Sequence, residues 1–344
     1  MTITLGRTGL VVPKNGFGAL PIQRIGFDAA DYLLNKALDH GMYYFDTARS
    51  YTDSEEKLGR ALRHKRHQAI ISTKTAATSA EGFWRDLATS LRTLQTDYID
   101  LYQFHNPAFC PVPGDGTGLY EAMQEAVAQG KVRHVGITNH RLAVARQAVE
   151  SDLYETLQFP FSYLAGEQEL RLVEGCASHH MGYIAMKALA GGLISHAATA
   201  FAFLAQYPLV EPIWGIQRES ELDEWLSFQQ NPPALTDEMR QRIERDRQQL
   251  SGNFCRGCGY CQPCPAGIQI EDCNRMSLFL RRAPYETYLT EDYHRKMQRI
   301  QGCLRCGHCS RKCPYGLDTP NLLQANYRDF MEHWRHKEDF LGKK

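Results

Sequence analysis

Two short segments near the C-terminal end of this 344-residue chain contain eight of its eleven cysteines. The first reads NFCRGCGYCQPCPAG at 253–267, and the second reads GCLRCGHCSRKCPYG at 302–316. The N-terminus, MTITLGRTGLVVPKNG, lacks the apolar stretch and the cleavage site of a secretory signal, so we expect a cytoplasmic protein. In a reducing compartment, clustered thiols bind metal more often than they form disulfides. The cysteine segments therefore predict a metal-binding domain.

The spacing of the second segment is Cys-x2-Cys-x2-Cys-x3-Cys-Pro, which is the spacing of bacterial [4Fe–4S] ferredoxins. The first segment differs only in having two residues before its last cysteine. In two-cluster ferredoxins the fourth cysteine of a motif serves the other cluster, so we predict two [4Fe–4S] clusters with crossed use of Cys264 and Cys313. The eight predicted metal ligands are Cys255, Cys258, Cys261, Cys264, Cys303, Cys306, Cys309 and Cys313.

Zinc is the alternative metal, because paired Cys-x2-Cys motifs also form tetrahedral sites of four thiolates. Zinc needs two pairs, whereas this chain has triplets followed by Cys-Pro, which favours iron and sulfur. Cys273 lies outside both motifs. We expect it to be a buried core thiol, with a substitute ligand as the alternative.

The first 230 residues alternate between short apolar runs and amphipathic helical stretches. The runs, rich in β-branched and aromatic residues, are typical of strands buried on both faces; they are YYFD at 43, AIIST at 69, YIDLYQFH at 98, VRHVGIT at 132, ETLQF at 155, GYIAM at 182 and EPIWG at 211. With NGFG near residue 15 as a first short strand, about eight strand–helix units result. This number predicts a (β/α)8 TIM barrel. A doubly wound sheet is the rival fold, but no G-x-G-x-x-G follows an early strand.

Changes in residue pattern along the sequence divide the chain into three parts. We expect the α/β barrel at 1–228, with TITLGRTGLVV as a small hairpin across its N-terminal end. Pro232 and Pro233 then begin a polar stretch, from which we expect a linker helix at 229–253. The remainder, 254–344, predicts a small α-helical, ferredoxin-like iron–sulfur domain.

Charge and hydropathy narrow the class of partner. Lys plus Arg number 39 and Asp plus Glu number 39, so we expect no binding of nucleic acid. The most apolar region is interrupted by charged residues, glycines and a proline, whereas a bilayer span needs about 20 apolar residues. We therefore expect no membrane insertion.

Polar residues close three consecutive strands of the predicted barrel: Asp46, Lys74 and His105, with Tyr51 in the loop after the first. Reactive groups in such barrels lie at the C-terminal ends of strands. Reduction of a carbonyl needs a proton donor, and a phenol titrates near pH 10 unless a cation lies beside it. We therefore predict Tyr51 as the proton donor, Lys74 and Asp46 as the groups that tune it, and His105 as the residue that orients the substrate oxygen.

The stretches YYFDTARSYTDSEEKLGRAL, STK, DLYQFHNP, GKVRHVGITNH and MKALAGG resemble the aldo-keto reductase family over roughly residues 1 to 228. The resemblance implies a catalytic tetrad of Asp46, Tyr51, Lys74 and His105. It also implies NADP or NAD bound without a Rossmann fingerprint, with Thr138, Asn139 and Gln158 at the nicotinamide amide. The remaining cofactor contacts that it implies are Gly18, Ala19, Met186, Leu189, Gly191, Gly215, Arg218 and Glu224.

Three positions depart from the family pattern. Met186 stands where a tyrosine usually stacks on the nicotinamide, and Thr52 replaces the usual glycine after the catalytic tyrosine. Glu221 stands where an arginine commonly binds the adenosine phosphate, so the choice between NADPH and NADH stays open. The loop after His105 is expected to line the substrate pocket with Phe109 and Cys110.

The segment CRGCGYCQPCPAGIQI and the helical stretches around the cysteines resemble the dicluster ferredoxin-like tail of an aldo-keto reductase subgroup. The resemblance implies an oxidoreductase for a small carbonyl-type substrate. Three roles for the clusters stay open: electron exchange with a redox partner protein, structural staples, or an electron-transfer module for which the barrel is only a scaffold. A flavin would usually mediate between hydride and one-electron chemistry, and we see no sequence sign of one.

Overall fold

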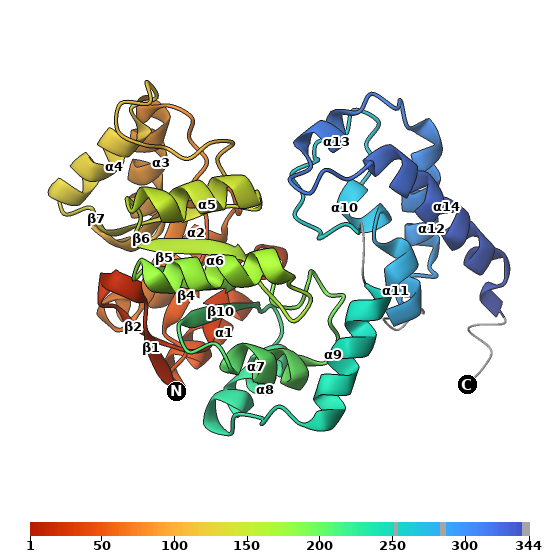
Figure 1. The fold of residues 1–344 in the computed structure, drawn as a ribbon, viewed down its shortest axis with the longest axis horizontal. Helices are drawn as coiled ribbons and strands as arrows, with labels where there is room; N and C mark the ends of the chain where they lie inside the picture. The colour runs from red at the N-terminus through yellow and green to blue at the C-terminus, as the bar shows by residue number, and fades with distance from the viewer. Residues whose placement is uncertain (251–253, 283–286, 339–344) are drawn as a thin grey trace. The chain divides into compact units, whose positions relative to one another are not determined.

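The computed structural model describes residues 1–250, 254–282 and 287–338. Its first 215 residues contain eight parallel strands that close into a barrel in the order β10-β3-β4-β5-β6-β7-β8-β9 (Figure 1). The strands are β3 (Gly16–Gly18), β4 (Tyr44–Asp46), β5 (Ile70–Thr75), β6 (Ile99–His105), β7 (Val132–Thr138), β8 (Thr156–Pro160), β9 (Gly182–Met186) and β10 (Val210–Gly215). All seven apolar runs and the short NGFG segment contribute to these strands, so the predicted barrel is confirmed.

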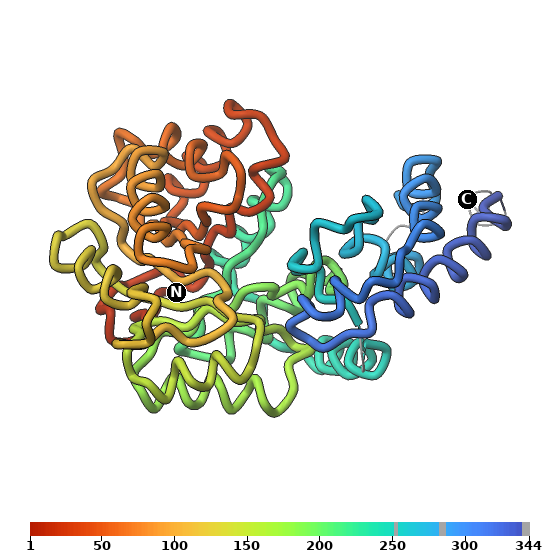
Figure 2. Tube along the Cα trace, turned by 90° about the horizontal axis from the view of Figure 1, so that it is seen from above, coloured from red at the N-terminus to blue at the C-terminus, as the bar shows by residue number. Residues whose placement is uncertain are grey.

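One α-helix follows each strand and packs on the outside of the barrel (Figures 1 and 2). The first of them buries Leu33, Leu34 and Leu38 on one face, as an amphipathic helix does when it covers a sheet. The eight helices are α1 (Phe27–Asp39), α2 (Ser54–Leu62), α3 (Ala80–Thr93), α4 (Leu119–Ala128), α5 (Leu142–Ser151), α6 (Glu167–Ser178), α7 (Ala197–Ala205) and α8 (Glu219–Gln230).

A two-stranded hairpin, β1 (Thr2–Thr4) and β2 (Val11–Pro13), covers the N-terminal end of the barrel, as predicted. Its turn contains Gly6, whose φ is +55° and whose place leaves no room for a side chain, because a Cβ there would lie 2.1 Å from the backbone nitrogen of Gly182. Gly182 is the first residue of β9, so this contact is at the N-terminal edge of the strands. The opposite end, where the strands finish, is left for polar side chains.

The C-terminal part is helical in its described residues, as predicted. Its helices are α9 (Asp237–Gln249), α10 (Ile270–Cys273), α11 (Met276–Arg282), α12 (Glu291–Gln298), α13 (His308–Lys312) and α14 (Thr319–Arg335). The longest, α14, packs against α10, α11, α12 and α13 and contributes Leu323 and Phe330 to their shared apolar core. The other described residues of this part form loops or short 3-10 turns, including the described residues of both cysteine segments up to α13.

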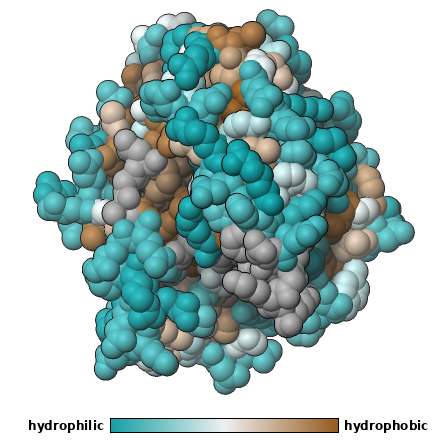
Figure 3. Space-filling model, turned by 90° about the vertical axis from the view of Figure 1, so that its right-hand side faces the viewer, coloured by the Kyte–Doolittle hydropathy of each residue, from teal (hydrophilic) through white to brown (hydrophobic). Residues whose placement is uncertain are grey.

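The chain forms two compact units, which differ slightly from a simple division along the sequence. One contains residues 1–188 and 198–240, and the other contains 189–197 and 241–344. The segment between β9 and α7 therefore belongs with the helical unit, while the domain limits proposed from sequence stay predictions. On the face drawn in Figure 3, hydrophilic side chains cover most of the surface, with smaller hydrophobic patches between them. Among the described helices, none combines the length and the apolar character that a bilayer crossing requires.

Candidate functional site

Asp46 and Lys74 form a buried ion pair at the C-terminal ends of the neighbouring strands β4 and β5. The Lys74 ammonium donates to both carboxylate oxygens of Asp46, each at 2.7 Å, and to the backbone oxygen of Thr47 at 2.6 Å. Burial lowers the pKa of Lys74, and the Asp46 carboxylate opposes that shift. The two strand ends thus hold an ammonium group that makes hydrogen bonds to three acceptor atoms of the chain.

Tyr51 and His105 lie next to this pair. Lys74 Nζ is 5.4 Å from the centre of the Tyr51 ring, and the Tyr51 and His105 rings meet edge to face with centroids 5.7 Å apart. Burial, with a smaller effect of the Lys74 charge, lowers the pKa of His105 to about 3. His105 is therefore a neutral imidazole at physiological pH. The four predicted catalytic residues are brought together.

Several supporting residues at this site were missed by sequence reasoning. Ser50 Oγ lies 3.2 Å from His105 Nδ1, and Gln103 Nε2 lies 2.8 Å from both Ser72 Oγ and Gln158 Oε1. Gln158 in turn donates to Asp46 at 3.3 Å, which connects a predicted cofactor residue to the ion pair. Their polar side chains resemble surface residues in the sequence, and only the strand positions of Gln103 and Gln158 could have indicated burial.

The predicted nicotinamide residues Thr138 and Asn139 end β7 and are both buried. The Asn139 amide donates to the backbone oxygen of Pro107 at 2.9 Å and accepts from the backbone N–H of Arg141 at 2.7 Å. Asn139 is thus held rigidly by two chain segments. One amide hydrogen remains for a ligand.

The other predicted cofactor residues fall into two groups. Most lie at or just beyond the C-terminal ends of barrel strands, at the N-cap of α8 or within α8: Gly18, Ala19, Met186, Gly215, Arg218 and Glu224. Leu189 and Gly191 instead lie in the segment that belongs to the helical unit. The structure thus brings most of the set to one end of the barrel.

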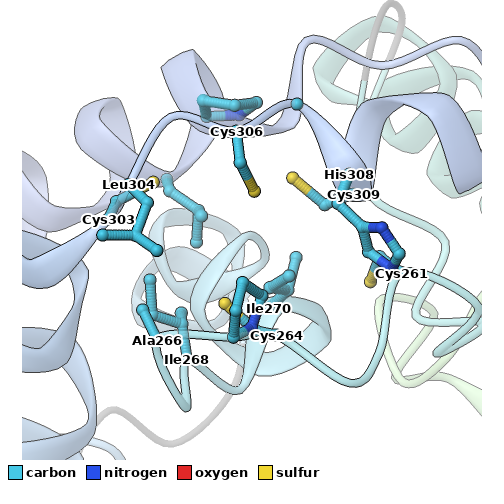
Figure 4. A pocket seen from close by; sticks show the side chains of 14 residues that line it. Cys261, Cys264, Ala266, Ile268, Ile270, Cys303, Leu304, Cys306, His308 and Cys309 are labelled. Atoms are coloured by element: carbon cyan, nitrogen blue, oxygen red, sulfur yellow. The ribbon is translucent and has the colours of Figure 1, made fainter.

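The cysteines of the helical unit surround two neighbouring cavities. One is lined by Cys264, Cys303, Cys306 and Cys309, with Cys261 at its edge; Figure 4 shows Cys306 and Cys309 directing their sulfur atoms into it. The other is lined by Cys255, Cys258, Cys261 and Cys313. Each cavity is therefore lined by three cysteines of one segment and by one or two of the other, with Cys261 lining both.

The remaining side chains of both cavities are mostly apolar, and burial raises the pKa of the Cys255, Cys261 and Cys309 thiols. Thiols in such surroundings become thiolates when they bind metal. Within the described residues, no three Cys, His, Asp or Glu side chains converge on one point as the ligands of a single ion do. A cluster spaces its thiolates more widely, because each one binds a different iron atom. The donor set fits iron–sulfur clusters.

Two cysteines outside the motifs, Cys273 and Cys110, are buried. Cys273 lies in the apolar core of the helical unit, as expected, and lines neither cavity. Cys110 is buried after β6, beside Tyr154 and Ser151, while its neighbour Phe109 is exposed.

A model of the aldo/keto reductase family matches residues 15–202, which is more than half of the chain. The chain belongs to the aldo/keto reductase family. The family resemblance seen in the sequence is thereby confirmed. A second model, for a 4Fe-4S dicluster domain, matches residues 254–318 and covers both cysteine segments. This match resolves the choice between iron–sulfur and zinc in favour of iron–sulfur.

Relatives and solved structures agree with this membership. The Bacillus subtilis oxidoreductase YqkF is 28% identical over 207 residues, which cover 56% of this chain and 65% of YqkF. Methylglyoxal reductase DkgB of Salmonella typhi is 30% identical over 195 residues, which cover 53% of this chain and 69% of DkgB. The match to the B. subtilis aldo-keto reductase YhdN spans 63% of that protein, so the chain covers just under two thirds of some of these relatives.

Among solved structures, an aldo/keto reductase of Klebsiella pneumoniae in complex with NADP and acetate has a TM-score of 0.61 at 25% identity, covering 71% of this chain and 94% of that one. An aldo-keto reductase of Bacillus halodurans in its holo form has a TM-score of 0.62 at 22% identity, covering 71% and 95%, and shows the shared fold.

As an aldo/keto reductase, this chain is unusual at two of the positions noted above. Thr52 has a φ of +39°, in the left-handed region that glycine adopts without strain, which explains why glycine is usual there. Glu221 accepts from the backbone N–H groups of Gln217 and Arg218 at the start of α8. Its other oxygen pairs with the Arg218 guanidinium, so the two charges compensate each other.

Proposed function

We propose that this chain is a nicotinamide-dependent reductase of a small carbonyl compound, with Tyr51 as the proton donor to the substrate oxygen. The observation that carries the proposal is the buried Lys74 ammonium, held by Asp46 at 2.7 Å and 5.4 Å from the Tyr51 ring centre. A cation beside a phenol favours the phenolate, so the proton leaves Tyr51 more readily. Asp46 keeps the cation in place.

His105 orients the carbonyl oxygen. We assign Ser50 as the donor to Nδ1; the proton of the neutral imidazole then resides on Nε2, which becomes the donor toward the substrate. A neutral donor stabilises negative charge that develops on the oxygen without competing with Tyr51 for protonation. When bound, the nicotinamide supplies the hydride that completes the reduction.

The cofactor is NADP(H) or NAD(H), bound at the C-terminal ends of the strands. The NADP complex of the K. pneumoniae relative and the rigid position of Asn139 support this assignment. Thr138, Asn139 and Gln158 would contact the nicotinamide amide, and Arg218 would contact the adenosine end. Met186 would pack its thioether on the ring face, where polarizable sulfur makes favourable contacts.

Methylglyoxal is a suitable first substrate, because a relative is named for its reduction. The test compares anaerobically purified protein with a Tyr51→Phe variant in an NADPH- and NADH-coupled assay. We expect the variant to lose about 10²–10⁴-fold in kcat, since it lacks the proton donor. Tyr32→Phe, which changes an exposed tyrosine on α1, is the matched control and is expected to keep full activity. Equal activity of Tyr51→Phe and wild type would refute the role of Tyr51.

We also infer two [4Fe–4S] clusters with crossed ligands, one held by Cys255, Cys258, Cys261 and Cys313, the other by Cys264, Cys303, Cys306 and Cys309. The distribution of the cysteines over two cavities supports this assignment. Iron and acid-labile sulfide assays should give two clusters per chain. In Cys313→Ser and Cys264→Ser, different clusters should be perturbed in the EPR spectrum of the reduced protein.

The clusters either relay electrons or staple the helical unit. Addition of NADPH under anaerobic conditions distinguishes the two roles. Loss of the visible absorbance of the clusters would mean that electrons pass from nicotinamide to iron. Unchanged absorbance, with cofactor bound, would leave the clusters structural or facing a separate partner. If the wild type reduces no carbonyl, the alternative is an electron-transfer protein with the barrel as an NAD(P)-binding scaffold.

A further inference from the structure

The loop Cys303–Cys306 presents an unusual combination of groups to solvent. Cys306 is the exposed member of the eight motif cysteines, all of which lie in the described part of the chain. Two residues before it, Leu304 is 67% exposed, more than any other large hydrophobic side chain among the described residues. Both line the cavity that Cys264, Cys303 and Cys309 share. An apolar side chain and a thiol of the cavity wall thus lie together at the surface.

The backbone of this loop is strained. Arg305 has a φ of +48°, a left-handed conformation that costs a non-glycine residue about 1–2 kcal/mol. Glycine would relieve the strain, and Gly302 and Gly307 stand close by in the same loop.

Positive charge surrounds the exposed thiol. Arg299, Arg305, Arg311 and Lys312 fall in the stretch 299–317, which contains no Asp or Glu. Arg311 donates to the backbone oxygen of Cys306 at 3.1 Å. Lys312 and Arg299 reach the backbone oxygens of Gln262 and Gly267, at 3.5 and 3.4 Å, and so flank the same cavity.

Some cations of the helical unit have acidic partners. On α12, Lys296 pairs with Asp292 at 2.9 Å, and on α11 Arg281 pairs with Asp329 at 2.6 Å. Within the described residues, none of Arg305, Arg311 and Lys312 forms an ion pair. Their positive charge offsets part of the negative charge of the thiolates. The positive charge that remains exposed to solvent can attract an acidic protein surface.

The other cavity is less accessible. Its Cys255 is buried, and the largely buried guanidinium of Arg275 lies beneath Gly257 and bonds to the backbone oxygen of Gly191. The two cavities share Cys261 and Ile270, so they are direct neighbours. An electron that enters at the exposed cavity therefore has a short route to the inner one, and from there to the 189–197 segment.

We propose that Leu304, Cys306 and the cations Arg299, Arg305, Arg311 and Lys312 form the docking face for an acidic one-electron carrier protein. The apolar leucine makes the central contact, the cations select an acidic partner, and the exposed cavity edge keeps the tunnelling distance short. In each encounter the carrier loses one electron and the docked cluster gains one, with no bond or proton transferred. This inference rests on the proposed clusters and specifies their partner.

The test is anaerobic stopped-flow reduction of the full chain by a chemically reduced, acidic plant-type ferredoxin. The charge-reversed variant Arg305→Glu/Lys312→Glu should react about tenfold more slowly at low ionic strength, and the difference should vanish at high salt. The matched control Arg328→Glu/Arg335→Glu reverses two exposed cations on α14 and should change the rate less than about twofold. Leu304→Gln should lower the rate at every salt concentration.

Iron, sulfide and EPR signals must match the wild type in each variant, so that a slower rate reports docking. Equal rates for wild type and the Arg305→Glu/Lys312→Glu variant, or an equal loss in the control, would overturn the proposal. So would faster reaction with a basic carrier, or a dimer in sedimentation that the charge reversal dissociates. Absence of clusters would overturn it too, whereas failure of carbonyl reduction in the same samples would refute only the barrel's proposed activity.

Discussion

The polar site of the barrel and the thiol sites of the helical unit are held together in different ways. In the barrel, strand ends and directed hydrogen bonds place Lys74 and Asp46, and both are satisfied by the chain itself. In the helical unit, cysteines on loops line apolar cavities, and burial raises the pKa of several thiols. The first site is therefore organised by folding alone, whereas the second is organised by folding together with metal binding.

The largest effect should come from removing iron. Oxidative destruction of the clusters with a chelator should unfold the helical unit, because α10–α14 share a small core beside the cavities. The barrel should stay folded, since its core does not include the motif cysteines. Limited proteolysis with mass spectrometry should therefore yield a protected fragment that ends near residue 240. If the C-terminal part resists protease equally well before and after iron removal, the proposed difference between the two sites would be refuted.

Lys74→Met tests whether the barrel site is organised as described. We expect a loss of about 10²–10⁴-fold in kcat for methylglyoxal reduction, because Tyr51 loses its cation. Stability should also fall by about 3–5 kcal/mol, because the buried Asp46 carboxylate is left without its cation. The double variant Lys74→Met/Asp46→Asn should regain much of the stability and none of the activity. If the double variant is active, Lys74 has no role in the chemistry.

A second buried carboxylate, that of Glu55, helps to hold the residues around Lys74 in place. Glu55 on α2 accepts from Thr73 and Ser90, each at 2.7 Å, and pairs with Arg49, whose backbone N–H donates to the backbone oxygen of Lys74. Glu55→Ala should destabilise the barrel by about 3 kcal/mol in denaturant unfolding, because it leaves several polar groups without their hydrogen-bond or ion-pair partner. Glu150→Ala removes an exposed carboxylate and should cost less than about 0.5 kcal/mol. A similar small cost for both would contradict this role of Glu55.

Much of the fold and the principal site residues were predictable from sequence. Buried parallel strands show as continuous apolar runs, and the polar residues that close them, such as Asp46 and Lys74, are conspicuous for that reason. The cysteine spacing predicts the crossed use of Cys264 and Cys313, which stays a prediction. Supporting residues were not predictable: Glu55 and Ser50 look like surface polar residues, but Glu55 is buried and Ser50 contacts His105, and both features depend on contacts across the fold. The bond from Arg275 to Gly191 joins residues 84 apart in sequence, beyond any local pattern.

The neutral state of His105 gives a pH signature that belongs to the barrel. In the unfolded chain a histidine binds a proton below about pH 6.5, whereas folding lowers the pKa of His105 to about 3. The unfolded state therefore binds more protons between these values, so the stability is complete above pH 6.5 and falls as the pH drops. From pH 7 to pH 5 the wild type should lose about 2 kcal/mol more than His105→Gln.

Denaturant unfolding of the barrel, followed by tryptophan fluorescence at both pH values, measures this difference. His64→Gln changes an exposed histidine and is expected to keep the wild-type pH dependence. Parallel curves for wild type and His105→Gln would show that folding does not lower the pKa of His105, so that it takes up a proton in the folded protein over this pH range, contrary to the neutral donor proposed here.

The smallest effect should come from the cofactor end of the barrel, where the contacts are exposed. Glu221 takes up the charge of Arg218, so a phosphate on the adenosine competes with a carboxylate for that guanidinium. In Glu221→Gln the amide oxygen still accepts from the α8 N-terminus, while the charge is gone. We expect the KM ratio of NADPH to NADH to fall about threefold to tenfold, in keeping with one exposed charge. Steady-state kinetics with both cofactors measure the ratio, and Glu238→Gln on α9 is the charge-matched control. An unchanged ratio would mean that Arg218 does not contact the phosphate, and the selection between cofactors would then reside in the strand ends rather than at α8.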